Sequence, residues 1–152
     1  METTLKKTSR FHLSDKAKEI TIDAVAYIFI ALFIYTATDK FMTMDVFIKF
    51  ISRLDMMHSV GKYVAWLIPI TEVVISILLM VPITRRKGLI ASGILMTVFT
   101  LYLIYMKIFI EVVPCHCGGV ISSLTWMQHI WFNIIFIVLA GIAISFSNKR
   151  AN

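Results

Sequence analysis

Four long apolar stretches alternate with short polar segments along the chain. They cover residues 20–38, 63–82, 89–110 and 129–146. Each can cross a hydrocarbon core of about 30 Å, which takes about 20 helical residues. None has the alternating pattern of a membrane barrel strand, and in lipid a helix satisfies its own backbone. The pattern therefore predicts an all-α integral membrane four-helix bundle.

The polar segment at residues 39–62, between the first two spans, has a pattern of its own. Apolar residues recur there at helical spacing, at Phe47, Phe50, Ile51, Leu54 and Met57. Charged residues fall mainly on the opposite arc, at Lys49, Arg53 and Asp55. This predicts an additional amphipathic interfacial helix. A helix that only covers the bundle and a functional lid both fit the pattern.

Composition supports a membrane protein and excludes an ordinary soluble domain. Apolar residues make up 59% of the 152 residues and charged residues 16%, which leaves too little polar surface to face water. The expected partner is the lipid bilayer. The net charge of +6 does not indicate nucleic acid, because the positive residues form short clusters between apolar runs.

The basic residues predict the orientation. If the spans alternate, ten of the fifteen Lys and Arg residues fall on one side: Lys6, Lys7, Arg10, Lys16, Lys18, Arg85, Arg86, Lys87, Lys149 and Arg150. The positive-inside rule places that side in the cytoplasm. We therefore expect a cytoplasmic tail at 1–19, a membrane domain at 20–146 and a cytoplasmic tail at 147–152. The first apolar run is longer than a signal-peptide core of about 7–15 residues, so a cleaved signal is disfavoured.

The two cysteines of the chain, Cys115 and Cys117, flank His116 in the segment between the last two spans. Cysteines two positions apart can form a strained local disulfide, and strained, exposed disulfides tend to be exchangeable. A protonated His116 would stabilise a neighbouring thiolate. The predicted side is the oxidising one in a bacterium. Redox exchange is the favoured interpretation, with soft-metal binding and simple packing as alternatives.

Glu72 lies near the middle of the second span. A charge at that depth costs about 2.5–3.5 kcal/mol on insertion scales, so it should face the bundle interior, be paired or be protonated. A functional role and a buried hydrogen bond between helices both fit. Lys40, at the outer end of the first span, is a partner only if the helices tilt or Glu72 lies higher than expected.

One face at the start of the fourth span is polar. Trp126, His129 and Asn133 are spaced i, i+3 and i+7 and so share that face, close in sequence to the cysteines. His129 could donate or accept a proton in thiol chemistry near neutral pH. It could equally mark the water boundary. Trp131 is better explained as part of an interfacial aromatic belt.

Several of these motifs, in this order, resemble the MauE/DoxX group of small four-helix membrane proteins. The likeness runs from Ile20 to Ala143. The motifs are Ala37-Thr38-Asp39-Lys40-Phe41, Pro69-x-x-Glu72, Arg85-Arg86, Pro114-Cys115-His116-Cys117-Gly118-Gly119 and Trp126-x-x-His129-x-x-x-Asn133. Members of the group typically carry Cys-Gly-Cys where this chain has Cys-His-Cys. The resemblance implies a redox-associated protein of the bacterial inner membrane, with maturation of methylamine dehydrogenase as one linked process and quinone-coupled sulfur oxidation as another.

Three functions are compatible with these residues. The first is a membrane thiol-disulfide oxidoreductase using Cys115, Cys117, His129 and Glu72, with a thioredoxin-like or disulfide-bearing extracytoplasmic partner and a membrane quinone as candidate cofactor. The second is a soft-metal-handling protein in which the cysteines join His116 or His129. The third is an assembly factor without catalysis. We name no metal ligands and no cofactor-binding residues from the sequence.

Overall fold

The computed structural model describes residues 15–52, 60–109 and 125–151. Its elements are five helices: α1 (Asp15–Met42), α2 (Met44–Ser52), α3 (Gly61–Met80), α4 (Arg85–Phe109) and α5 (Trp126–Ala151). Among the described residues, four helices are long and apolar enough to cross a membrane. The predicted all-α membrane bundle is confirmed.

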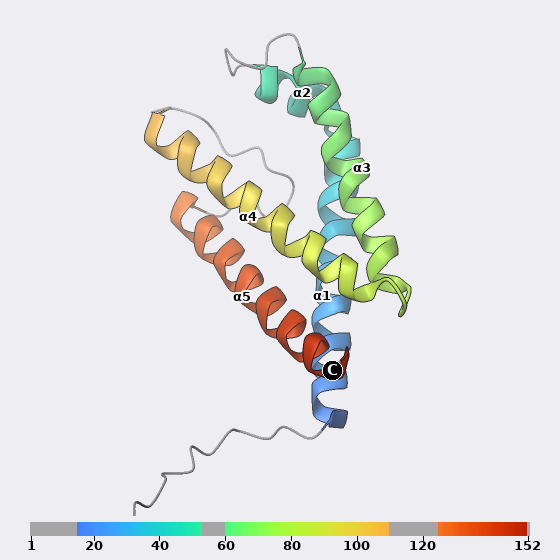
Figure 1. The fold of residues 1–152 in the computed structure, drawn as a ribbon. Helices are drawn as coiled ribbons and strands as arrows, with labels where there is room; N and C mark the ends of the chain where they lie inside the picture. Colours follow the sequence, from blue (N-terminus) through green and yellow to red (C-terminus); the bar gives the residue numbers. More distant parts are fainter. Residues whose placement is uncertain (1–14, 53–59, 110–124, 152) are drawn as a thin grey trace, which may run out of the picture.

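The four long helices form a ring in which neighbours pack in the order α1, α3, α4, α5 and back to α1. They alternate in direction, so that the start of α1 and the end of α5 lie at the same end of the bundle (Figure 1). The core centres on the aromatic ring of Phe29, which meets Phe136 of α5 edge-on at 5.3 Å. Because lipid replaces water around the bundle, large apolar residues such as Leu67 stay exposed on its outside.

The helices extend beyond most of the apolar runs that predicted them. Polar Lys16, Lys18 and Glu19 already belong to α1, which also continues past Thr38 to Met42. Helix α3 ends at Met80, earlier than expected, since the residue before a proline avoids helical angles. Val81, which precedes Pro82, is accordingly extended, with φ −85° and ψ 118°.

Helix α2 confirms the amphipathic pattern for residues 44–52. Phe47 and Ile51 are buried and pack with Ala65 of α3, whereas Lys49 is exposed. The rest of the predicted helix, including Leu54 and Met57, lies outside the described residues. Helix α2 therefore packs beside the start of α3 at one end of the bundle (Figure 1).

The opposite end is held by an ion pair. Arg85 opens α4 and contacts Asp23 of α1 through its guanidinium, while its Nε donates to the carbonyl of Leu79 at 3.2 Å. Three consecutive basic residues at a helix start oppose the helix dipole, and Asp23 offsets part of that cost. The basic residues Arg85, Arg86 and Lys87 therefore lie in the first turn of α4, at the end of the bundle where α1 starts.

Gly88 marks the closest approach of α4 to α3. A Cβ added there would lie 2.9 Å from Leu79 Cδ2 and 3.0 Å from the Leu79 backbone nitrogen. We expect Gly88→Ala to lower the free energy of unfolding by about 1–3 kcal/mol, because the added methyl overpacks against backbone. Unfolding by SDS in mixed micelles, followed by circular dichroism, measures it.

Gly141→Ala is the matched control, since a Cβ at Gly141 meets nothing within 4 Å. This variant should be as stable as the wild type or up to about 1 kcal/mol more stable, because alanine favours helix. Equal stability of the two variants would contradict the close packing assigned to Gly88.

Candidate functional site

A buried ion pair joins α1 and α3. Lys40 Nζ lies 2.8 Å from Oε1 and 3.1 Å from Oε2 of Glu72. It also lies 3.4 Å from the carbonyl oxygen of Thr36. Glu72 is 1% exposed and Lys40 is 8% exposed. The conditional partnership suggested by the sequence is thus realised, and the carboxylate of Glu72 is not isolated.

The helix geometry explains why Lys40 reaches so deep. Because Cβ atoms tilt toward the helix N-terminus, a lysine near the end of α1 points back along its own helix, past Thr36, into the bundle. The ammonium also lies 5.9 Å from the centroid of the Phe99 ring on α4, a cation–π distance. The carboxylate of Glu72 and the ring face of Phe99 together offset part of the cost of removing the ammonium from water.

Helix α5 brings His129 and Asn133 to the interior. They are four residues apart on one face, and both are buried, with 8% and 3% exposure. Within the described part of the chain, the Nδ1 atom of His129 has no hydrogen-bond partner. Trp131, on another face, is 61% exposed, which agrees with a lipid- or interface-facing role. The side chain of Trp126 lies outside the described residues.

A capping box sets where α5 begins, and therefore where His129 lies. The backbone N–H of Thr125 donates to Oε1 of Gln128 at 2.9 Å. The backbone N–H of Gln128 lies 3.4 Å from Oγ1 of Thr125. This reciprocal Thr-x-x-Gln arrangement is a recognised helix start. The Thr125-x-x-Gln128 spacing is the sequence signal for this helix start, which lies three residues before the predicted start of the fourth span.

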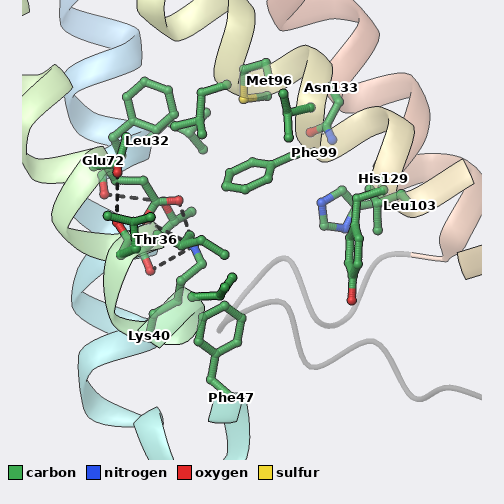
Figure 2. A pocket seen from close by; sticks show the side chains of 18 of the residues that line it. Leu32, Thr36, Lys40, Phe47, Glu72, Met96, Phe99, Leu103, His129 and Asn133 are labelled. Carbon is green, nitrogen blue, oxygen red and sulfur yellow. Dashed lines mark hydrogen bonds and ion pairs between the residues drawn. The ribbon is translucent and has the colours of Figure 1, made fainter. Parts of the chain in front are cut away.

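The ion pair, His129 and Asn133 line one cavity of about 360 Å³. All five helices contribute to its wall. The polar lining residues are Thr36, Lys40, Thr71, Glu72, Tyr102, His129 and Asn133, and the remainder are apolar, including four phenylalanines. In the view of Figure 2 the ring of Phe99 lies between the Lys40–Glu72 pair and His129. The sequence pointed to Glu72, His129 and Asn133, with Lys40 as a conditional partner of Glu72. It carries no signal for Phe99 or for the cavity itself.

The position of the two cysteines relative to the cavity is not described. Cys115, His116 and Cys117 lie outside the described residues. The structure describes the helix ends on either side of them, which are Phe109 of α4 and Trp126 of α5. In the described ranges, no group of three or more His, Cys, Asp and Glu residues is arranged to hold a metal ion.

The site can perform two kinds of task. Its carboxylate, ammonium and imidazole are buried side chains that can exchange protons. Its shape, apolar with a few convergent polar groups, is typical of small-molecule pockets, which measure about 300–1,000 Å³. The residues for both tasks lie in the same half of the bundle, which holds α2 and the start of α5.

Comparison with known proteins agrees with the sequence motifs. The family model described as methylamine utilisation protein MauE matches residues 18–146. That range includes α3 and α4 in full and most of α1 and α5, together with the Lys40–Glu72 pair, His129 and both cysteines. No curated protein and no solved structure matches the chain. With a family match over most of its length and four membrane-spanning helices, this chain belongs to the MauE family of multi-pass membrane proteins.

Proposed function

We propose that the protein carries out thiol-disulfide exchange at the outer face of the bacterial inner membrane, through Cys115 and Cys117. Its partner is a thioredoxin-like or disulfide-bearing extracytoplasmic protein whose maturation it supports. The family description points to methylamine utilisation as the process served. One observation carries the proposal: the buried Lys40, Glu72 and His129 gather in the half of the bundle where the cysteine segment begins and ends.

The exchange step moves two electrons between two cysteine pairs. A thiolate of the pair attacks one sulfur of a partner disulfide, and the partner's other sulfur leaves as a thiolate that takes up a proton. The second cysteine then attacks the mixed disulfide, loses its proton and releases the partner as a dithiol. Run in reverse, the same two displacements place a disulfide in the partner. Either cysteine can be the attacking one in this scheme.

His129 is the proposed proton carrier for this exchange. It begins the buried face of α5 only 12 residues after Cys117, and an imidazole can accept a proton from a thiol and return it near neutral pH. Glu72 is proposed to act with Lys40 as a buried charge pair that keeps the interior polar at this depth. Oxidation of the cysteine pair needs an acceptor, for which we propose a membrane quinone.

The redox state of the cysteines tests the proposal directly. Native membranes are treated with oxidant or reductant, and free thiols are then blocked with a reagent of known mass. We expect two added reagent masses after reduction and none after oxidation. The change from one state to the other should occur at a redox potential between those of the two treatments. A protein whose cysteines keep one labelling state under both treatments does not carry out exchange.

Orientation has its own readout. With the termini in the cytoplasm, a membrane-impermeant thiol reagent added outside spheroplasts should label Cys115 and Cys117 after reduction. Labelling only in inverted vesicles would reverse the topology that the positive-inside rule predicts.

A further inference from the structure

The cavity carries hydrogen-bonding groups on two walls, with apolar surface between them. Lys40 and Glu72 come from α1 and α3, and His129 and Asn133 come from α5. Aromatic rings line the space between, including that of Phe99 (Figure 2). A cavity with polar groups on two walls suits a flat ring with polar atoms at two ends, rather than a molecule with a single polar head.

The charges of the wall select a neutral ligand. Lys40 and Glu72 are the sole Lys, Arg, Asp or Glu residues among the described residues that line the cavity. At 2.8 Å they neutralise each other, so no uncompensated cation is left for a fatty-acid carboxylate or a lipid phosphate. An anion here would bring a buried charge without a partner, which is costly in an apolar setting.

Two polar groups can turn toward a ligand oxygen. Nδ1 of His129 is buried and has no hydrogen-bond partner within the described residues, a state that ordinarily costs about 1–3 kcal/mol. The contact of Lys40 Nζ with the Thr36 carbonyl, at 3.4 Å, is the longest of its three. It is the one that an incoming acceptor would replace at least cost, while the bonds to Glu72 persist.

We propose that this cavity binds the head group of a lipid-soluble quinone, held by His129 and Lys40 through its two ring oxygens and by Phe99 along its ring. In this arrangement His129 carries its hydrogen on Nδ1 and donates it. The apolar walls contributed by α3 and α4 take the start of the alkyl tail. The inference rests on the proposed function for the source of electrons, but the binding itself does not require the cysteines to react.

The bound ring would supply an acceptor for the electrons that the cysteine pair releases. Forming one disulfide from two thiols frees two electrons and two protons, and reducing a quinone to a quinol consumes the same number. His129 and the Lys40–Glu72 pair lie at the two walls where protons would have to arrive. The residues of this chain thus provide both the hydrogen bonds for the ring and groups able to pass protons.

Binding is tested with the full-length Cys115→Ser, Cys117→Ser protein in lipid nanodiscs, so that no exchange chemistry takes place. The probe is a radiolabelled decyl-benzoquinone, with decylbenzene as the matched molecule that lacks ring oxygens and empty nanodiscs as background. We expect saturable binding of one quinone per protein and no saturable binding of decylbenzene. A photoreactive form of the quinone should label peptides of α4 and α5.

Four single variants sharpen the result. His129→Leu should weaken quinone binding about 5–30-fold through one lost hydrogen bond, and His129→Gln, which keeps an N–H donor, should restore most of it. Trp131→Leu, on an exposed face of the same helix, should leave binding unchanged. Phe99→Trp places a larger ring where the quinone ring would lie and should also weaken binding, which supplies a second test if His129→Leu does not fold.

Three results would overturn the inference: no saturable quinone binding above empty nanodiscs, equal binding of decylbenzene, or wild-type affinity in both His129→Leu and Phe99→Trp. The outcome is separable from the proposed exchange. Cysteines that cycle in a protein without quinone binding reject this site and leave the exchange standing. Quinone binding in a protein whose cysteines never cycle supports the site and rejects the exchange.

Discussion

Lys40→Met lowers the free energy of unfolding by about 3–5 kcal/mol, the expected cost of removing one member of a buried ion pair. The carboxylate of Glu72, at 1% exposure, is left with no cation beside it, in the middle of a membrane helix. Its short side chain cannot reach the water boundary from there. Unfolding by SDS in mixed micelles, followed by circular dichroism, gives the difference from the wild-type protein.

The reverse change is expected to cost less. In Glu72→Met, the long side chain of Lys40 is two residues from the end of α1, so its ammonium can extend toward the polar boundary. The double variant Lys40→Met, Glu72→Met should regain most of the stability that Lys40→Met loses, because neither charge remains. This cycle measures the coupling of the pair, which single changes do not.

Lys62→Met is the matched control for the loss of a lysine. Lys62 is exposed in the first turn of α3, and substitutions at such positions usually change stability by about 0.5 kcal/mol or less. A double variant no more stable than Lys40→Met, or a Lys40→Met protein as stable as Lys62→Met, would show that the pair does not stabilise the bundle.

The architecture followed from the sequence because membrane helices obey a simple rule. Every backbone group must be satisfied inside its own segment, so four apolar runs of sufficient length imply four helices whatever their neighbours are. The basic clusters between the runs then predict which ends of the helices lie in the cytoplasm. Helix bounds were less predictable, since a helix does not end where its apolar run ends, as Lys16 and Lys18 of α1 show.

The ion pair could be anticipated only in part. Depth along one helix can be counted from the sequence, and Glu72 was expected to face the bundle interior, be paired or be protonated; it is buried and paired. Whether Lys40 reaches it depends on the relative register of α1 and α3 and on helix α1 continuing to Met42. Both are set by packing between helices, for which a single sequence carries no direct signal.

The cavity was the least predictable feature. All five helices contribute to its wall, so its existence depends on how these helices pack against one another. Phe99 lines it, yet in the sequence Phe99 is one apolar residue among many in its span. The sequence pointed to two separate features, Glu72 within the second span and the polar face of His129 and Asn133 on the fourth, but did not indicate that they line one cavity.

Replacing either Cys115 or Cys117 by serine is expected to reduce partner maturation to the level of cells that lack the protein. Exchange needs one sulfur to attack and the other to resolve, so each single variant should be as defective as the double variant, as is usual for residues that act as a unit. The measurement is the yield of correctly disulfide-bonded partner in cells that carry each variant in place of the wild type.

The single variants should also differ from the double variant in one respect. A lone remaining cysteine that attacks a partner disulfide has no neighbour to resolve the product, so a mixed disulfide accumulates. It can be isolated under non-reducing conditions and identified by mass spectrometry, and it should disappear on reduction and be absent from the double variant. The cysteine that yields the larger amount of trapped partner is the attacking one. If the double variant retains full maturation, the cysteines are incidental and the bundle acts as an assembly factor without catalysis.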